Sequence, residues 1–261
     1  MIPLALTPVA LTIAGSDPSG GAGIQADLKT FHQFGVYGAS AITLVTVQNT
    51  VRVSRVETLN AALVAAQIAA VLEDLPPRAV KTGALGTAAI IEAVASFDFP
   101  CPLVIDPVMI SKHGAPLLDG DARALMRRLL LPRASLVTPN TEEAAEMAGI
   151  PVHDPDSMRT AARRIADLGA PSVLVKGGHI SGDATDILYD GRDFFEFSAP
   201  RIATRHTHGT GCSYSAAITA HLARGLDLVS AVRTAKGWIA RAIETNPGLG
   251  AGHGPVNHWA L

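Results

Sequence analysis

The stretch that decides the fold is VALTIAGSDPSGGAG, residues 9–23, which joins an apolar run of strand length to a turn containing four glycines. The apolar run, 9–14, lacks regular alternation with polar residues, which is typical of strands covered on both faces in a parallel sheet. A helical pattern follows at 23–34. Because ligands of open α/β sheets bind beyond the carboxyl ends of the strands, this turn is a candidate site. Its glycines would let the backbone approach a ligand closely.

The same order of strand, turn and helix recurs along most of the chain. Further strands are predicted at residues 41–47, 79–81, 103–105, 136–138 and 173–175, with helices at 57–73, 88–96, 121–130, 142–148 and 157–168. Two more strands, 185–189 and 194–198, flank the hairpin turn signal Asp190-Gly191, and helices follow at 213–224 and 229–245. This order predicts a three-layer open α/β sheet, mostly parallel, with helices on both faces and an antiparallel hairpin at one edge. Since the sequence contains no linker or internal repeat, residues 1–261 are expected to form one domain.

The composition excludes several classes of protein. Apolar residues make up 48% of the 261 residues and charged residues 17%, which is too apolar for a disordered chain. The net charge of −2 argues against a nucleic-acid surface. The uncharged segment 30–51 contains an apolar run, 39–47, of only strand length, so no membrane segment is predicted. Two cysteines cannot form a disulfide framework, and a cytoplasmic location with reduced thiols is expected.

The glycine-rich turn has two competing interpretations. Residues 21–26 match the loose dinucleotide fingerprint G-x-G-x-x-A, but that fingerprint requires an acidic residue near the end of the second strand. Gln48 and Asn49 stand there instead, which disfavours a dinucleotide site. The turn could also be purely structural, and Asp27 could be an ordinary charge near the start of a helix, stabilised by the helix dipole.

A second glycine-rich stretch, HGTGCS at residues 208–213, precedes an apolar helix. Backbone amides that converge at a helix N-terminus form an anion hole suited to a phosphoryl group in transfer. Cys212 would lie at this N-terminus, where the pKa of a thiol is expected to fall. The competing interpretation is an ordinary buried cysteine after a glycine turn. Cys101, between two prolines, is expected to be structural.

Charged residues follow three of the predicted strands. Asp106 and Lys176 each come directly after a strand, and a lysine there could reach phosphates. Asn140 followed by Glu143 resembles a capping box, although Glu143 could also lie near a hydrated Mg²⁺. Each residue alone could be a solvated or capping group. Together with the anion hole they form the set that phosphoryl transfer requires.

Long motifs resemble the bacterial hydroxymethylpyrimidine/phosphomethylpyrimidine kinases of thiamin biosynthesis, members of the ribokinase-like superfamily. The resemblance begins with residues 10–30, ALTIAGSDPSGGAGIQADLKT, and spans nearly the whole chain. It continues through VQNT at 47–50, DPVM at 106–109, TPN at 138–140, VKGGH at 175–179, THGTGC at 207–212 and GHGPVNH at 252–258. The resemblance implies an ATP- and Mg²⁺-dependent kinase that phosphorylates 4-amino-5-hydroxymethyl-2-methylpyrimidine and then its monophosphate. A homodimer is also implied.

The resemblance assigns roles to individual residues. The pyrimidine would contact positions matching Gly15, Asp27, Thr46 and Gln48. The anion hole would consist of Gly209, Thr210 and Gly211, with Cys212 where related sugar kinases carry an aspartate base. The nucleotide would meet Asn140, Lys176, His208, Gly209 and Thr210. Asp106 and Glu143 would organise Mg²⁺ largely through water.

This chain departs from the family pattern at two positions. Ala84 stands where a methionine is expected against the pyrimidine, and His206 stands where an asparagine is expected. The first departure could loosen the substrate pocket, so a pyridoxal or pyridoxine kinase is the nearest alternative function. A pyrimidine-binding module without turnover is a more distant alternative, which the intact Lys176 and Cys212 disfavour.

Overall fold

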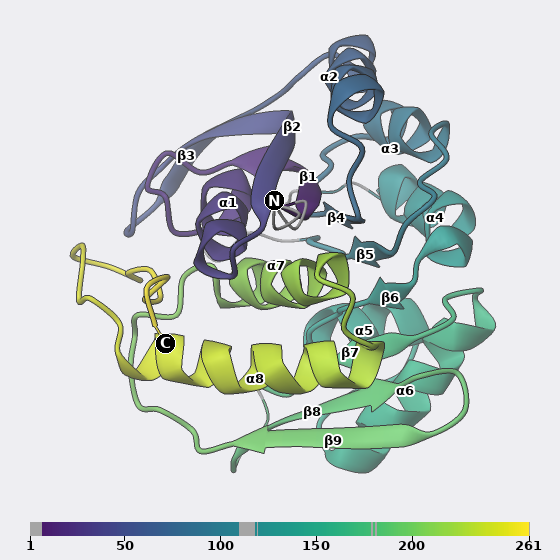
Figure 1. Ribbon diagram of the computed structural model, residues 1–261. Helices are drawn as coiled ribbons and strands as arrows, with labels where there is room; N and C mark the ends of the chain where they lie inside the picture. The colour runs from purple at the N-terminus through teal and green to yellow at the C-terminus, as the bar shows by residue number, and fades with distance from the viewer. Residues whose placement is uncertain (1–6, 110–117, 119, 179, 181, 261) are drawn as a thin grey trace, which may run out of the picture.

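A computed structural model describes residues 7–109, 118, 120–178, 180 and 182–260. These residues form one nine-stranded sheet in the order β3-β2-β1-β4-β5-β6-β7-β8-β9 (Figure 1). The strands are β1 Val9–Ser16, β2 Tyr37–Gln48, β3 Val53–Thr58, β4 Ala79–Thr82, β5 Leu103–Ile105, β6 Leu136–Val137, β7 Val173–Val175, β8 Ala184–Tyr189 and β9 Phe194–Ala199. The helices are α1 Gly23–Gln33, α2 Ala61–Asp74, α3 Ala88–Ala95, α4 Gly120–Leu129, α5 Thr141–Ala148, α6 Pro155–Asp167, α7 Thr210–Ala223 and α8 Leu228–Glu244, with a short 3-10 turn at Leu131–Arg133.

Six neighbouring strands, β2, β1, β4, β5, β6 and β7, run parallel to one another. The hairpin of β8 and β9 continues the sheet in antiparallel fashion beyond β7. The predicted fold class, a mostly parallel α/β sheet with an antiparallel edge hairpin, is therefore confirmed.

The opposite edge differs from the prediction. Strand β3 pairs antiparallel with β2, whereas the sequence predicted a helix from residue 57 onwards. The helix α2 begins instead at Ala61, where the Asn60 side chain accepts a hydrogen bond from the Ala62 N–H. None of the six residues of β3 is fully buried, so this strand carries no apolar pattern that sequence analysis could detect.

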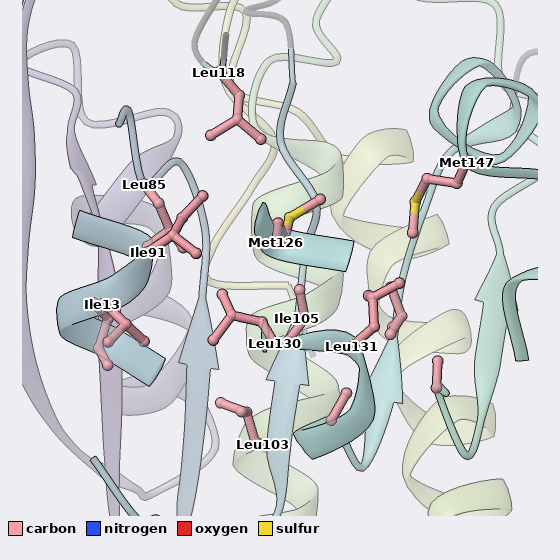
Figure 2. Packing of buried hydrophobic residues seen from close by; sticks show 14 of the residues in the cluster. Ile13, Leu85, Ile91, Leu103, Ile105, Leu118, Met126, Leu130, Leu131 and Met147 are labelled. Carbon is pink, nitrogen blue, oxygen red and sulfur yellow. The ribbon is translucent and has the colours of Figure 1, made fainter. Parts of the chain in front are cut away.

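Helices cover both faces of the sheet. On one face, α2, α3, α4, α5 and α6 pack on the sheet through the largest hydrophobic cluster (Figure 1). Ile13 of β1, Ile105 of β5, Ile91 of α3 and Met126 of α4 all belong to this cluster (Figure 2). On the other face, α1, α7 and α8 pack against the sheet through two smaller clusters. Within the described residues, no helix has the length and hydropathy needed to cross a bilayer.

The topology gathers the polar segments at one end of the sheet. Because β1, β5, β6 and β7 are parallel, the residues that follow them all lie at the same end of the sheet, where the carboxyl ends of these strands meet. The glycine-rich turn follows β1, Asp106 follows β5, Asn140 follows β6 and Lys176 follows β7. Helix α7 begins at Thr210, three residues earlier than predicted, so its first turn includes the conspicuous glycine-rich stretch.

Candidate active site

The two glycine-rich stretches are in direct contact. Gly209 has a φ of 75°, and a Cβ atom there would collide with the carbonyl oxygen of Gly21. A Cβ atom at Gly21 would in turn lie 2.5 Å from Cδ2 of His208. The backbone of Gly23 acts to lower the pKa of the Cys212 thiol, although burial has the larger effect. Only glycine allows so close an approach of two backbones, which explains the glycines in both stretches.

The N-terminus of α7 presents backbone amides to this junction. Gly209 is the N-cap in a left-handed conformation, and Thr210, Gly211 and Cys212 form the first turn. Amides of a first turn precede the regular intrahelical hydrogen bonds, and the helix dipole adds positive potential there. A Cβ atom at Gly211 would lie 3.3 Å from Nζ of Lys176, so the lysine ammonium stands beside this turn. The arrangement is suited to an anion such as a phosphoryl group.

Asp17 and His208 hold the two stretches together. His208 Nε2 lies 2.8 Å from Asp17 Oδ2, and both residues are buried. Asp17 also accepts hydrogen bonds from the backbone N–H groups of Ser19 and Ala22. Burial alone would raise the pKa of Asp17, but the hydrogen bonds from His208 and Ser19 hold it below its ordinary value. Asp17 was not singled out from the sequence, whereas His208 was assigned to the nucleotide; the structure adds a bridging contact between the two residues.

A cavity of 610 Å³ opens at this junction. Its wall includes all the residues that the sequence analysis assigned to a site except one: Gly15, Thr46, Gln48, Asp106, Asn140, Glu143, Lys176, His208, Gly209, Thr210, Gly211 and Cys212. Ala84, one of the two departures from the family pattern, also lies on the wall. The exception is Asp27.

Asp27 lies behind the cavity wall and is fully buried. Its Oδ2 accepts hydrogen bonds from Lys81 Nζ at 2.9 Å and from Thr12 Oγ1 at 2.6 Å. Burial raises the pKa of Asp27, and Lys81 opposes that rise. The expected direct contact between Asp27 and a substrate therefore has no support in this geometry. Lys81, which the sequence analysis overlooked, is recognisable in retrospect as a lysine inside the apolar strand 79–82.

Lys176 and Asp106 form an ion pair on the cavity wall. Lys176 Nζ lies 2.9 Å from Asp106 Oδ1, and Ser215 Oγ donates to Asp106 Oδ2 at 3.1 Å. Burial would raise the pKa of Asp106, but Lys176 and Lys81 hold it below its ordinary value. Asp106 is thus kept ionised between two cations. The fold thus brings together Lys176 and Asp106, which follow two different strands in the sequence.

The capping box predicted at the start of α5 is present. Asn140 Oδ1 accepts from the N–H groups of Glu142 and Glu143 at 2.9 Å each, and Glu143 Oε2 accepts from the Asn140 N–H at 2.8 Å. Both residues of the box also line the cavity, so capping and a contact with a ligand are compatible. Burial raises the pKa of Glu143 to about 7, while nearby Lys176 opposes the rise.

The carboxylates of this wall suit a hydrated magnesium ion. Mg²⁺ in phosphate sites usually keeps several waters and takes one or two carboxylates. Asp106 and Glu143 supply two such groups, and the charge of Asp106 helps to raise the pKa of Glu143. A cation between them would relieve that repulsion. Among the described residues, no group of three or more His, Cys, Asp or Glu side chains is arranged so that it could hold a metal ion.

The pKa of the Cys212 thiol differs from the value expected from the sequence. Its pKa was expected to fall at the helix N-terminus, but burial raises it to about 11. Lys81 lowers it, while the charges of Asp106 and Asp27 raise it further. The desolvation of a thiolate therefore outweighs the neighbouring cation. Cys212 is a neutral thiol at neutral pH in this structure.

A further group of cavity residues escaped the sequence analysis. Lys236 of α8, Asp186 of β8, Tyr214 of α7 and Arg201 all line the cavity beyond Lys176. Lys236 Nζ lies 2.7 Å from Asp186 Oδ2. A signal was available, because Asp186 is the single charged residue of the strand predicted at residues 185–189.

Comparison with known proteins identifies the family of this chain. The family model described as phosphomethylpyrimidine kinase matches residues 17–257. The hydroxymethylpyrimidine/phosphomethylpyrimidine kinase of Bacillus subtilis is 47% identical over 258 residues, covering 97% of this chain and 95% of that protein.

Two solved structures share the fold at high sequence identity. A phosphomethylpyrimidine kinase from Clostridium difficile is 44% identical with a TM-score of 0.81, covering 91% of this chain and all of that one. An ADP complex of Bacillus subtilis pyridoxal kinase is 39% identical with a TM-score of 0.91, covering 98% of each chain. The resemblance noted in the sequence is confirmed, and the chain belongs to the phosphomethylpyrimidine kinase family.

Proposed function

We propose that this protein uses ATP to phosphorylate 4-amino-5-hydroxymethyl-2-methylpyrimidine and then the resulting monophosphate, in the formation of thiamin diphosphate. The observation that carries the proposal is the contact between the glycine-rich turn after β1 and the first turn of α7 at the mouth of one cavity. That contact would hold a small ring alcohol beside an anion hole. Family membership supports the same activity.

The ring would lie at the end of the cavity near the first glycine turn. Gly15 lets the Leu44 side chain pack directly against the backbone there, because a Cβ atom at this position would lie 2.5 Å from Cδ1 of Leu44. Thr46 and Gln48 of β2 line the same end, and the Gln48 amide can both donate to and accept from an aminopyrimidine edge. Asp27 would act on the ring only through the wall, by holding Lys81.

The triphosphate would lie between the first turn of α7 and the ends of β6 and β7. Lys176 would move from Asp106 toward the phosphates, Asn140 would contact them, and the amides of residues 209–212 would receive the phosphoryl group in transfer. Mg²⁺, held by Asp106 and Glu143 largely through water, would neutralise charge on the phosphates. An apolar slot for the purine base would be lined by Ala199, Pro200, Ile202, Ile239, Ala240 and Ile243.

In the reaction, the substrate hydroxyl oxygen forms a bond to the γ-phosphorus while the bond to the β–γ bridging oxygen breaks. The hydroxyl proton would pass to an oxygen of the transferring phosphoryl group or to water during this step. Because the pKa of Cys212 is about 11, its thiol holds its own proton at neutral pH and cannot readily accept another. Cys212 would therefore orient the hydroxyl and line the anion hole instead of serving as a base.

Substitution of Cys212 separates these two roles. We expect Cys212→Ser to retain kcat within about tenfold, because a hydroxyl can replace the thiol as a hydrogen-bonding wall group. Loss of a general base would reduce kcat by about 10²–10⁴-fold in both Cys212→Ser and Cys212→Ala. A loss of that size in both variants would restore the base assignment.

The substrate itself is tested by competition in a coupled ADP-release assay. We expect kcat/KM for the pyrimidine alcohol to exceed that for pyridoxal, and a second ADP to be released only with the pyrimidine monophosphate. Pyridoxal kinase is the second candidate, because the small side chain of Ala84 lines the cavity where a methionine was expected and several structural neighbours are named for that activity. A higher kcat/KM for pyridoxal would select it. ATP binding without ADP release from either alcohol would indicate a binding module.

We also propose a cytoplasmic homodimer. Val45, Val47 and Val51 are exposed apolar residues at the end of β2 and in the adjoining turn, and an apolar surface of this kind is suited to a second copy. Sedimentation equilibrium would distinguish a dimer from a monomer. No nucleic-acid partner is proposed, since the chain has a net charge of −2.

A further inference from the structure

The strand pairing between β7 and β8 stops just before the turn that contains Lys176 and Gly177. The last ladder pair joins Val175 to Ile187. Two residues further, Gly177 passes so close to β8 that a Cβ atom there would collide with the Thr185 carbonyl oxygen. The Gly177 N–H donates instead to Oδ1 of Asp186, at 2.9 Å in a buried setting. A side-chain carboxylate has therefore replaced the backbone acceptor that a continued ladder would supply.

The second oxygen of this carboxylate binds a buried lysine. Lys236 Nζ lies 2.7 Å from Asp186 Oδ2 and 2.6 Å from the carbonyl oxygen of Ala184. The two side chains are 10% and 4% exposed for Lys236 and Asp186 respectively, so the pair is almost removed from water. Lys236 reaches it from α8, which packs against the β8–β9 hairpin (Figure 1). One ion pair thus ties α8 to β8 and to the turn after β7.

Burying such a pair is costly, and well-packed apolar side chains of similar volume often give equal or greater stability. Stability alone is therefore a weak reason for an aspartate and a lysine at these positions. What the pair fixes is the peptide on one side of Lys176, through the Gly177 N–H. The peptide on the other side is fixed by the Lys176 N–H, which donates to the Pro139 carbonyl at 2.8 Å. The backbone of Lys176 is thereby held from both sides.

We propose that Asp186 and Lys236 are a positioning pair that fixes the Lys176–Gly177 peptide and so aims the Lys176 ammonium at the phosphates of a bound nucleotide. This inference rests on the proposed function in taking a nucleoside triphosphate as the ligand of Lys176. It assigns Asp186 the task of an acceptor for one N–H group, and Lys236 the task of keeping that acceptor ionised and in place.

Two neutral double variants isolate the acceptor from the charge. Asp186→Asn/Lys236→Met removes both charges but keeps a side-chain oxygen for the Gly177 N–H. Asp186→Ala/Lys236→Met removes both charges and the acceptor. Neither variant leaves an unpaired buried charge. The difference in nucleotide affinity between the two variants therefore reports the effect of the hydrogen bond to Gly177. Thermal unfolding of both variants checks that each is folded at the assay temperature.

Affinity for AMP-PCP, a non-hydrolysable ATP analogue, is measured by calorimetry, which needs no pyrimidine and no turnover. We expect the alanine variant to bind AMP-PCP about tenfold more weakly than the asparagine variant, as a displaced phosphate-binding group would produce. Equal affinities of the two variants would overturn the proposal, because the pair would then be only structural.

The same comparison in a Lys176→Met background tests whether the pair acts through Lys176. We expect the tenfold difference to disappear there, since the group being positioned is absent. A difference that persists would mean that Asp186 touches the nucleotide directly or shapes the whole cavity, and it would overturn the positioning role. Steady-state kinetics provide a further test where pyrimidine turnover is observed. KM for ATP should rise in the alanine variant, while KM for the pyrimidine should stay within about twofold of the wild-type value. Equal rises in both KM values would overturn the proposal.

Should the chain phosphorylate a different alcohol, the AMP-PCP measurements would still decide this inference separately from the proposed function.

Discussion

Two of the three lysine–aspartate pairs that the described residues form at the cavity differ in what they can do. Lys81–Asp27 and Lys176–Asp106 both have N–O distances of 2.9 Å. Both lysines line the cavity, but in the first pair both side chains are 0% exposed, whereas in the second the lysine is 12% exposed. We call Lys81–Asp27 the sealed pair, because neither partner is exposed for exchange with a ligand. We call Lys176–Asp106 the open pair, because its lysine can be released to an anion entering the cavity.

The pKa values of the two aspartates, Asp27 and Asp106, are shifted in opposite directions. Burial raises the pKa of Asp27, which faces one lysine. For Asp106 the effect of burial is exceeded by Lys176 and Lys81 together, and its pKa lies below the ordinary value. The aspartate that the proposed reaction needs as an anion is thus the one placed between two cations. The sealed pair contributes to this through the charge of Lys81.

Breaking the sealed pair is expected to have the largest effect, and it should be an effect on stability. Lys81→Met leaves Asp27 buried beside Thr12 without its cation, which typically costs about 3–5 kcal/mol of unfolding free energy. Urea denaturation at neutral pH measures the loss. The matched control is Lys81→Met/Asp27→Asn, which removes both charges and should recover most of the stability. A loss below about 1 kcal/mol in the single variant would mean that the sealed pair contributes little.

Breaking the open pair should instead reduce turnover. Lys176→Met removes the cation that would stabilise the transferring phosphoryl group, and we expect kcat to fall by about 10²–10³-fold. Asp106 keeps its hydrogen bond from Ser215 and the nearby charge of Lys81, so the loss of unfolding free energy should be less than half that of Lys81→Met. Steady-state ADP release and urea denaturation test the two statements. If Lys176→Met lost as much stability as Lys81→Met, the contrast between the pairs would be wrong.

The sequence was most informative where apolar runs and glycines coincide with the sheet centre. The strands β1, β4, β5, β6 and β7 and the helices between them were predicted within a few residues, because unalternating apolar runs identify buried parallel strands. The edge strand β3 was missed because its exposed residues leave no apolar periodicity. Strand order, which brings separate strand ends to one cavity, became visible only in three dimensions.

Within the site, the sequence identified residues that follow strands and missed those whose role depends on distant partners. Lys81 lies inside a strand, and its importance appears only once Asp27, 54 positions away, is seen 2.9 Å from it. The prediction for Cys212 failed for a related reason. The helix N-terminus is local and visible in the sequence, but the burial that raises the pKa of the thiol to about 11 comes from the whole fold.

Glu143, beside the open pair, gives the smallest and most pH-specific effect. Its pKa is about 7 in the folded protein, against an ordinary value of 4.5, because burial disfavours the carboxylate. The folded protein therefore binds more protons than the unfolded chain between these two values, so unfolding free energy falls as pH rises from about 4.5 to 7. A shift of this size corresponds to about 3 kcal/mol above pH 7. Glu143→Gln carries no such penalty.

Urea denaturation of the magnesium-free protein at pH 4.5 and pH 8 tests this directly. We expect Glu143→Gln to match the wild type at the lower pH and to be more stable by up to about 3 kcal/mol at the higher pH. Glu142→Gln is the matched control, since Glu142 is the exposed neighbour in the same helical turn and should show no such gain. Adding Mg²⁺ at pH 8 should narrow the advantage of Glu143→Gln, because the ion stabilises the wild-type carboxylate. A pH-independent difference between Glu143→Gln and the wild type would show that the pKa of Glu143 is the same in the folded and unfolded protein. The cavity would then bring enough water to Glu143 to offset its burial, and the contrast between sealed and open charges would extend to this residue as well.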